Sequence, residues 1–563
     1  MRFAKIHISI FLLFVVLVFT RFVGLDWGLP YPMHPDERNM VVALLQIDCH
    51  QGPIIKCMNP HFFAYGQLPL YLGLIVFQFL HAIFPNLTTF DLATIALRII
   101  SASFSIFTVI VLMKMIRLFQ INDKLSLFVF YLMATFTPAF IQFAHFGTTE
   151  SALMFFYAFL MYLSLKYILR QSTERSFAIG SGIVLGLALG TKVSSIIFAA
   201  IPILAMVFGL SFVGKSTLVQ RLLTFLKTVL IFFLTSVLLF LISSPFNFIA
   251  WNEFVGSMRY EADVGFGIYR AFYTRQFEYA VPVLFQSVKI FPYVLGMPIY
   301  LLFSLGFLFL PWKKEYVFLR LQFLLFFIPT AFLYAKWTRF LVPVFPLMVF
   351  FAGLMLIQIF KKITTYKYFY QVTLLAIVTV SIIPGIAFLA IYTSPDVRFT
   401  ASEWIHSNIS KNYYILSETA NVVDIPLMGN GYRVVSFNFY DLENDFQLKD
   451  FLKMHISLAD YVFVPSRRIF ANHTCYEFDE SLLNVSLTGY KKERCVELNK
   501  RYPKINEYYN DLFNSSEYKL VQEVKSYPRI EMFGKTLITL PDENAEETWT
   551  VFDHPVIRVY KKI

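Results

Sequence analysis

The sequence predicts a polytopic α-helical membrane protein with a soluble α/β domain at its C-terminal end, for three reasons. Hydrophobic residues make up 57% of the chain and charged residues 15%, whereas about a quarter of the residues in a soluble domain are charged. Apolar runs of spanning length alternate with short polar loops as far as Tyr392. Beyond Tyr392 the composition is that of an ordinary soluble domain, with short β-rich runs at 413–416, 461–464 and 556–560.

The basic residues set the predicted orientation. The residues behind the formal net charge of +11 fall in short clusters between apolar runs, which is typical of cytoplasmic loops and gives no indication of a nucleic-acid partner. The first run, 6–23, follows Arg2 and Lys5 as a signal peptide would, but it is long and lacks a small-x-small cleavage site. We therefore expect it to remain as an anchor with a cytoplasmic N-terminus.

Taking the loops in order predicts about eleven spanning helices. The apolar run 68–84 is not counted among them. The loop after it, 85–91, has no Lys or Arg, whereas the loop after the next helix is basic (Lys114, Arg117, Lys124). The charge rule places the loop 85–91 outside and the basic loop inside. Both placements are possible only if 68–84 does not cross the membrane and is juxtamembrane on its outer surface. The predicted crossings are 6–23, 92–113, 125–145, 151–169, 177–190, 193–213, 225–243, 293–310, 317–334, 340–360 and 370–392.

These assignments divide the chain into two predicted domains. Residues 1–392 form the membrane domain, whose two long outer loops are 24–91 and 244–292. Residues 393–563 form an extracytoplasmic α/β domain, in which no catalytic signature is recognisable.

The four cysteines fall into two local pairs, Cys49 with Cys57 and Cys475 with Cys495. Both pairs lie in segments predicted to be outside the cytoplasm, where disulfides form. Chance spacing is the alternative, so the two disulfides are candidates.

Residues 209–216, Gly-Leu-Ser-Phe-Val-Gly-Lys-Ser, match the phosphate-loop pattern. That pattern needs a preceding strand and an α/β unit, so that backbone N–H groups can surround the phosphate. Here it follows an apolar run at the predicted inner end of a spanning helix. We therefore interpret Lys215 as an inner-face anchor.

A candidate site begins with the adjacent carboxylates Asp36 and Glu37, shortly after the first anchor. Ionisable groups near hydrocarbon are costly to desolvate, which favours a functional role, although a hydrated interfacial loop is the ordinary explanation for such a pair alone. Such a carboxylate is suited to act as a general base or as a ligand of a divalent cation. The predicted topology adds further ionisable residues on the same face: Arg98, His145, Glu150, Lys192, Arg270, Arg275, Lys336 and Arg339.

Each of these residues also has a structural explanation. His145 suits a helix cap, Lys192 a turn, and Lys336 and Arg339 interfacial anchoring. Together they indicate a site where cations hold an anionic, lipid-linked group while a carboxylate takes a proton from an acceptor.

Short motifs of the membrane part resemble those of the protein O-mannosyltransferase superfamily, and above all its bacterial and archaeal members. These enzymes have the GT-C fold and use polyprenyl-phosphate sugars. The motifs are LPYPMHPDE at 29–37, QLPLY at 67–71, LR and SA at 97–102, HFGTTE at 145–150, GLALGTK at 186–192 and KWTRFLVP at 336–343. The chain departs from the family pattern at Leu68, where the family has a proline, and at Glu150, where it usually has Asp.

The resemblance implies an inverting glycosyltransferase that moves a sugar from an undecaprenyl or dolichyl phosphate to an acceptor hydroxyl or amine at the outer membrane face. Asp36 would be the general base, and Glu37 would pair with Arg98. His145 and Glu150 would orient the site. Because the leaving phosphate is anionic, the cations expected to stabilise it are Lys192, Arg270, Lys336 and Arg339.

The implied partners are the lipid-linked donor, membrane lipid, and a protein, glycan or lipid acceptor. We expect no obligatory cofactor or metal, although the Asp-Glu pair leaves a divalent cation open. A polyprenyl-lipid transporter is the alternative, but it would need a polar path through the bundle, and few charges lie inside the predicted spans. A second alternative is a catalytically degenerate membrane scaffold.

Overall fold

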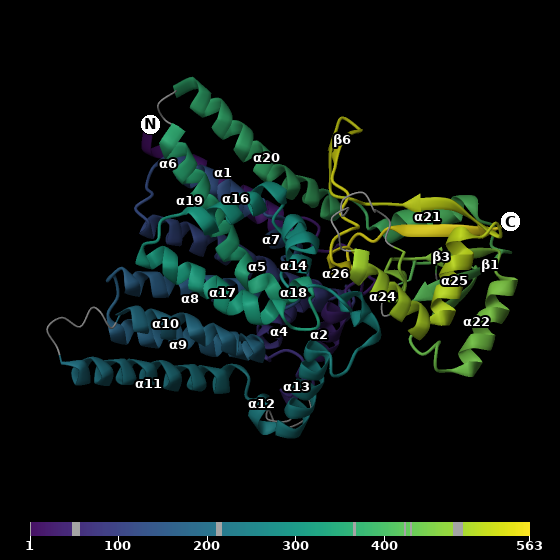
Figure 1. Ribbon diagram of the computed structural model, residues 1–563, viewed down its shortest axis with the longest axis horizontal. Helices are drawn as coiled ribbons and strands as arrows, with labels where there is room; N and C mark the ends of the chain where they lie inside the picture. Colours follow the sequence, from purple (N-terminus) through teal and green to yellow (C-terminus); the bar gives the residue numbers. More distant parts are fainter. Residues whose placement is uncertain are drawn as a thin grey trace.

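The computed structural model describes residues 2–47, 57–209, 217–363, 367–420, 424–427, 431–476 and 488–563. Cys49 and residues 210–216 of the phosphate-loop pattern, Lys215 among them, lie outside these ranges. A helical bundle occupies the left of Figure 1, and a part that contains a β-sheet adjoins it on the right.

In the described part of the chain, five helical segments are long and apolar enough to cross a membrane, and a helix pair bent by 116° would make a sixth. The segments are Thr89–Leu118, Glu150–Ile168, Leu218–Ser243, Thr338–Phe360 and Leu375–Thr393, with the bent pair Gln286–Val294 and Met297–Phe309. Shorter apolar helices are Phe11–Phe22, Leu68–Ile83, Lys124–Thr135 and Val193–Gly209.

Apolar side chains cover much of the outside of this bundle. On α11 (Leu218–Ser243), Leu226, Leu230 and Phe233 are each more than half exposed. An apolar surface of this size is costly in water and is expected against lipid. The chain is therefore a polytopic α-helical membrane protein with an additional sheet-containing part.

Each predicted crossing overlaps a helix, but fewer helices than predicted reach spanning length. The predicted crossing 125–145, for example, is broken into α6 (Lys124–Thr135) and α7 (Pro138–Gln142). Pro138 has no N–H to continue the hydrogen-bond ladder of α6, so a new helix starts there. Hydrophobic runs do not reveal such breaks.

The other helices of the bundle have these bounds: α1 (Arg2–Phe22), α2 (Pro35–Leu45), α4 (Leu68–Ile83), α5 (Thr89–Leu118), α8 (Glu150–Ile168), α9 (Glu174–Thr191), η1 (Val193–Ala199), α10 (Ala200–Gly209), α12 (Phe246–Ile249), α13 (Trp251–Phe266), η3 (Phe272–Phe277), α14 (Leu284–Lys289), α15 (Phe291–Val294), α16 (Met297–Phe309), α17 (Lys314–Ala331), α18 (Thr338–Leu341), η4 (Val342–Val344), α19 (Phe345–Ile363) and α20 (Lys367–Thr393).

Glycines on one face of α9 allow α11 to approach closely. A Cβ atom at Gly182 would lie 2.7 Å from the Phe232 carbonyl oxygen, and one at Gly186 would lie 2.6 Å from the Ser236 carbonyl oxygen. Small residues four positions apart are a common means of packing membrane helices. This packing fixes the C-terminal end of α9, where Lys192 follows.

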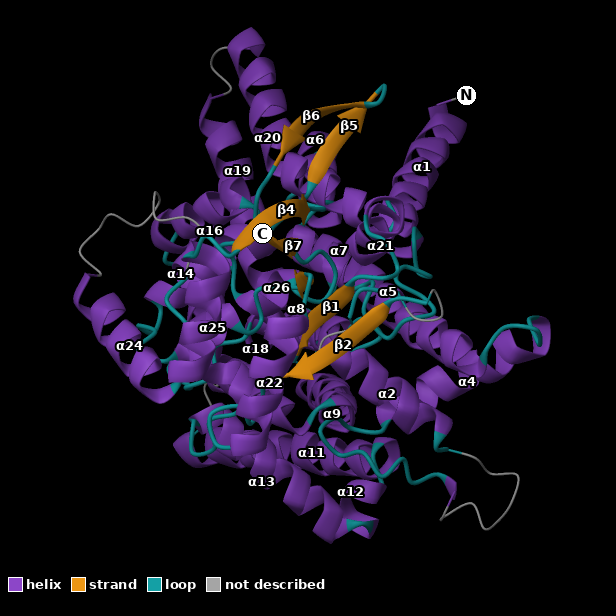
Figure 2. Cartoon of the chain, turned by 90° about the vertical axis from the view of Figure 1, so that its right-hand side faces the viewer, coloured by secondary structure: helices purple, strands orange, loops and turns teal. Residues whose placement is uncertain are grey.

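The sheet-containing part follows α20. Its elements are α21 (Val397–Asn408), β1 (Tyr414–Thr419), β2 (Arg433–Asn438), α22 (Phe446–Leu458), β3 (Tyr461–Val464), α23 (Phe470–His473), α24 (Thr488–Arg501), α25 (Pro503–Asn514), β4 (Tyr518–Val524), β5 (Arg529–Met532), β6 (Lys535–Thr539), α26 (Glu547–Thr550) and β7 (Ile557–Lys562). The five-stranded sheet has the order β2-β1-β3-β7-β4, and the strands appear in orange in Figure 2.

Strands β2, β1 and β3 are parallel, whereas β7 runs antiparallel to both β3 and β4. The β-rich runs predicted from the sequence fall on β1, β3 and β7. Cys475 and Cys495 form a disulfide. Cys57 is also disulfide-bonded, but its predicted pairing with Cys49 stays a prediction.

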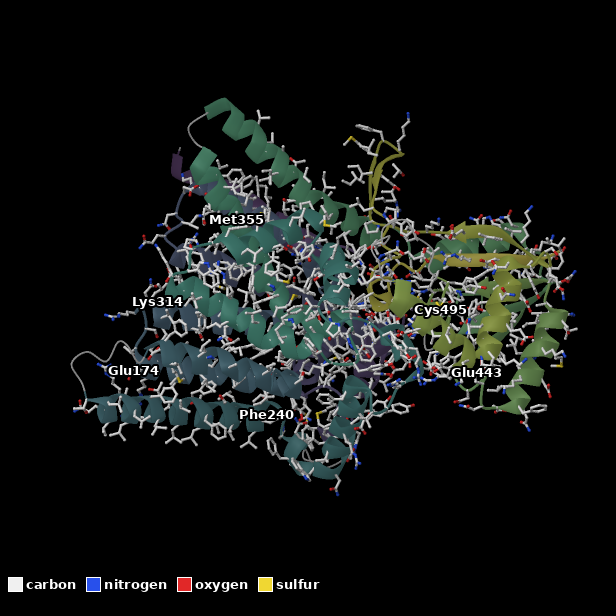
Figure 3. The ribbon with its side chains drawn as sticks, viewed as in Figure 1. Glu174, Phe240, Lys314, Met355, Glu443 and Cys495 are labelled. Carbon is white, nitrogen blue, oxygen red and sulfur yellow. A yellow bond between two sulfur atoms is a disulfide. The ribbon has the colours of Figure 1, made fainter. Side chains whose placement is uncertain are left out.

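Figure 3 relates the two ends of the molecule. Glu174 and Lys314, from two loops predicted to be cytoplasmic, lie at the end of the bundle far from the sheet, whereas Glu443 and Cys495 lie in the sheet-containing part. Loops assigned to one side of the membrane are thus at one end of the molecule.

Candidate active site

A cavity of about 470 Å³ lies where the bundle meets the sheet-containing part. Figure 1 shows α2, α18 and α26 together at this junction. Ionisable side chains from both parts line the cavity: Asp36, His61, Glu150, Lys192, Glu253, Glu261, Arg339 and Arg468. Aromatic rings fill much of the remaining wall, among them those of Tyr65, Phe146, Tyr273, Trp337, Trp549 and Phe552.

His34 fixes the start of α2. Its Nδ1 accepts hydrogen bonds from the backbone N–H groups of Asp36 (3.2 Å) and Glu37 (3.4 Å), and Pro35 occupies the first turn. The ring packs between Phe146 and Phe552, with centroids 4.6 and 4.5 Å away. Burial lowers the pKa of His34, so the neutral ring can keep Nδ1 as an acceptor.

Glu37 points away from the cavity into the protein. Its two carboxylate oxygens accept from Arg98 Nε and Nη2 at 2.8 and 2.7 Å, and the Gly147 N–H donates to Oε1 at 2.6 Å. Arg98 Nη1 also donates to the carbonyl oxygens of Leu25 and Trp27, both at 2.7 Å. The predicted Glu37–Arg98 pair is thus present and buried. Glu37 does not line the cavity, so it is not placed to touch a ligand there, contrary to its predicted grouping with Asp36 as a catalytic residue.

Asp36 faces the cavity and forms an ion pair with Arg339 Nη1. The two side chains are 24% and 23% exposed, so both remain accessible to a ligand. Burial alone would raise the pKa of Asp36, but the guanidinium group of Arg339, with a smaller contribution from Lys192, outweighs burial and lowers it. Asp36 is therefore ionised at neutral pH.

Lys192 follows the last turn of α9. Its Nζ lies 4.8 Å from the centroid of the Tyr65 ring, and among the described residues no carboxylate is within ion-pair distance of it. Burial lowers the pKa of Lys192, while Glu150 opposes this shift. An anion bound beside Lys192 would raise this pKa again.

Glu150 starts α8 and also faces the cavity, with 3% of its surface exposed. Its Oε1 has no hydrogen-bond partner among the described residues. A buried carboxylate oxygen without a donor is costly, so it is a natural acceptor for a hydroxyl group of a ligand.

The remaining predicted site residues lie outside the cavity lining. His145 stacks on Tyr392 with ring centroids 3.8 Å apart.

Lys336 Nζ donates to the Leu333 and Tyr334 carbonyl oxygens at 2.7 and 3.3 Å, and burial lowers its pKa to about 8. Arg270 pairs with Glu278 at 3.3 Å. The assignment of Arg270 and Lys336 to the phosphate site is therefore corrected, because topology predicts the side of the membrane but not the direction of a side chain.

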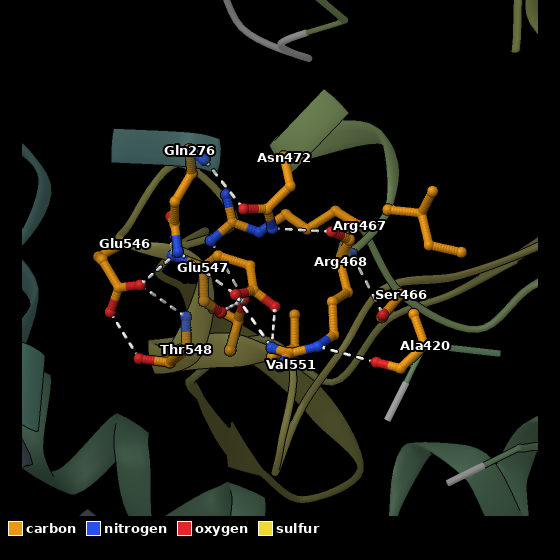
Figure 4. Close-up of polar contacts among 12 residues, drawn as sticks. Gln276, Ala420, Ser466, Arg467, Arg468, Asn472, Glu546, Glu547, Thr548 and Val551 are labelled. Carbon is orange, nitrogen blue, oxygen red and sulfur yellow. Dashed lines mark hydrogen bonds and ion pairs between the residues drawn. The ribbon is translucent and has the colours of Figure 1, made fainter. Parts of the chain in front are cut away.

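The sheet-containing part contributes residues that the sequence did not indicate. Arg468 lines the cavity and is 4% exposed. Its Nη1 donates to Glu547 Oε1 at 2.8 Å and its Nε to the Ala420 carbonyl oxygen at 2.9 Å, as Figure 4 shows. Its guanidinium group also lies near the rings of Tyr273 and Phe552. No motif surrounds Arg468, so only the tertiary structure reveals it.

Within the described ranges, no group of three or more His, Cys, Asp or Glu side chains is arranged to hold a metal ion. The carboxylate of Asp36 is instead engaged by a guanidinium group.

Comparisons with known proteins give distant structural similarities. No protein-family model and no curated protein matches the chain. A crystal structure of ArnT from Cupriavidus metallidurans bound to undecaprenyl phosphate is 14% identical, with a TM-score of 0.47, and the match covers 81% of this chain and 89% of that one. The archaeal oligosaccharyltransferase AglB from Archaeoglobus fulgidus, in complex with an inhibitory peptide and a dolichol-phosphate, is 12% identical, with a TM-score of 0.45, over 83% of this chain and 71% of that one.

Proposed function

We propose that this protein is an inverting glycosyltransferase that moves a sugar from a polyprenyl phosphate to an acceptor hydroxyl or amine at the outer membrane face. One observation carries the proposal: an ionised carboxylate, Asp36, faces a cavity beside two cations, Lys192 and Arg339. A base and an anion-binding pair in one cavity are what transfer from a phosphate-linked donor needs.

In the proposed reaction, Asp36 takes the proton of the acceptor as the acceptor oxygen or nitrogen attacks the anomeric carbon. The bond from that carbon to the phosphate oxygen breaks, and the electron pair leaves with the lipid phosphate. Lys192 and Arg339 stabilise the phosphate. A single displacement inverts the configuration at the anomeric carbon.

Arg339 couples donor binding to the base. In the structure it contacts Asp36 and lowers the pKa of that carboxyl. A donor phosphate would compete for the same guanidinium group, so Asp36 would become more basic when the donor is bound. The acceptor would then meet a stronger base than in the free enzyme.

The test uses purified protein in lipid nanodiscs with a polyprenyl-phosphate sugar and a cell-envelope extract as the source of acceptors. Asp36→Asn should bind the donor but transfer sugar about two to four orders of magnitude more slowly, because the amide cannot accept a proton. Asp26→Asn is the matched control, since Asp26 is exposed and lies in the same outer loop outside the cavity lining.

Near wild-type transfer by Asp36→Asn would exclude Asp36 as the base. If the protein were a transporter or a scaffold, Asp36→Asn would not lower transfer while leaving donor binding intact.

A further inference from the structure

The short helix that carries Arg339 receives its cap from the sheet-containing part. Helix α18 begins at Thr338, directly before Arg339, and its own N-cap residue, Trp337, makes no side-chain cap. Glu546 supplies it: Glu546 Oε2 accepts from the Thr338 backbone N–H at 3.1 Å and from Thr338 Oγ1 at 2.9 Å. The first N–H groups of a helix lack partners within the helix, and a carboxylate is a favourable acceptor for them.

Glu546 is itself held firmly. It is 1% exposed, and its Oε1 accepts from Gln276 Nε2 at 2.9 Å and from the Thr548 N–H at 3.1 Å. The Thr548 hydroxyl donates to Oε2 at 2.6 Å, and the Glu546 N–H donates to the Lys289 carbonyl oxygen at 2.8 Å. Figure 4 shows Glu546 between Gln276 and Thr548. A buried carboxylate with so many donors has little freedom to move.

Other contacts dock the two parts without Glu546. Asp553 Oδ2 accepts from the Tyr392 hydroxyl at 2.8 Å and from Gln142 Nε2 at 3.0 Å. The Gln276 backbone N–H donates to Asn472 Oδ1 at 2.9 Å. Docking is thus shared among several contacts, whereas the contact with the helix start that carries Arg339 belongs to Glu546.

We propose that Glu546 is a positioning residue of the active site, which holds Arg339 against Asp36 by capping the start of α18. The C-terminal part would then complete the catalytic geometry. The consequence for transfer rests on the proposed function, whereas the effect on the Asp36–Arg339 contact does not. A displacement of about 1 Å in such a contact is enough to lower activity strongly.

The first test is independent of activity. The coupling between Asp36→Ala and Arg339→Met is measured from apparent Tm values in detergent. It is the change in Tm of the double variant minus the sum of the changes in Tm of the two single variants. We expect coupling in the wild-type background and less than half of it with Glu546→Ala. Glu543→Ala is the matched control, because Glu543 lies in the same segment and pairs with Arg558 instead.

Thr338→Val serves as a second, milder variant if Glu546→Ala does not fold, because it removes one donor to Glu546 and leaves the carboxylate in place. It should reduce the same coupling to a smaller extent. Full coupling in the Glu546→Ala or Thr338→Val background would overturn the proposal. So would absence of coupling in the wild-type background, since Glu546 would then have no contact to maintain.

The second test measures transfer. Glu546→Ala should lower it about ten-fold, and the acid limb of the pH–rate profile should move to higher pH. The charged or titratable groups that act on Asp36 are Arg339, His34 and Lys192, and a displaced Arg339 lowers the pKa of Asp36 less. A ten-fold loss with an unmoved acid limb would contradict positioning through Arg339. If the wild-type protein transfers no sugar, the proposed function fails, while the Tm coupling still decides the role of Glu546.

Discussion

Asp36 and Glu37 are neighbours in the sequence, yet they have different environments because successive side chains on a helix point about 100° apart. Glu37 points inward, where Arg98 binds both of its oxygens. Asp36 points into the cavity, where one of its oxygens contacts Arg339. One helical turn thus carries one carboxylate buried in an ion pair with Arg98 and one that lines the cavity.

The first residue-scale prediction concerns Glu37 and Arg98. Removing either partner with Glu37→Gln or Arg98→Met leaves a buried charge uncompensated and should cost about 3–5 kcal/mol of stability. The double variant should lose clearly less than the sum, because neither charge remains. Thermal unfolding of the four proteins measures this, and additive losses would argue against the pair.

The second prediction compares two lysines of the predicted outer face. Lys192→Met should weaken polyprenyl-phosphate binding about ten-fold or more, because the variant removes a cation from the cavity. Lys336→Met should leave binding within about two-fold, since the Lys336 ammonium already serves the carbonyl oxygens of Leu333 and Tyr334. Binding in nanodiscs measures both, and an equal loss for the two variants would contradict the corrected assignment.

At the scale of elements, the sequence was most informative about where helices lie. Every predicted crossing overlaps a helix, and the β-rich runs fall on strands. The sequence did not predict the break before Pro138 or the short helix α18 that carries Arg339, because local packing and prolines decide such interruptions. Element existence follows from hydrophobic periodicity, whereas element ends depend on the tertiary structure.

The same limit applies to the site. Asp36, Glu150, Lys192 and Arg339 line one cavity, because each lies in or beside the first or last turn of a helix. Arg468 and Glu546 were missed, since their places in the site depend on how the sheet-containing part docks.

The docked segment also provides a pH-dependent element, His554. Burial alone would lower its pKa, but the carboxylates of Asp542 and Asp553, 2.8 and 2.6 Å from its ring nitrogens, outweigh burial and raise the pKa of His554 to about 10. The unfolded value is about 6.5. Because the folded state binds the proton more tightly, this stabilisation is complete below about pH 6.5 and is lost as the pH rises toward 10.

We therefore predict that the apparent Tm falls by about 2–5 °C more between pH 6.5 and 9.5 in the wild type than in His554→Gln. His406→Gln is the control, because His406 is a histidine of α21 outside this network. Equal pH slopes for the wild type and His554→Gln would exclude a charged His554.

At the scale of the whole molecule, the cavity lies between two parts of different character. The bundle supplies Asp36, Lys192 and Arg339, on helices surrounded by apolar surface. The sheet-containing part supplies Arg468 and the cap from Glu546. In the proposed reaction, the predicted topology lets a lipid-linked donor enter this cavity from the membrane and an acceptor from the aqueous side.

That topology is open to a direct test by labelling of single cysteines with a membrane-impermeant maleimide in intact cells. The chosen positions, Asn86, Gln120 and Gln171, are all exposed loop residues. No described cysteine is free to react. Asn86→Cys should label from outside, whereas Gln120→Cys and Gln171→Cys should label only after the membrane is permeabilised, because basic residues flank their loops.

The decisive position is Asn86, which follows α4 (Leu68–Ile83). This helix of 16 residues is short for a span of about 20 residues. If Asn86→Cys labels only from inside, α4 crosses the membrane and the sides assigned to the following loops must be reversed. The end of the bundle where α2 and α18 lie, beside the sheet-containing part, is far from Glu174 and Lys314. Labelling of Gln171→Cys from outside would therefore place the cavity on the cytoplasmic side and exclude transfer at the outer face.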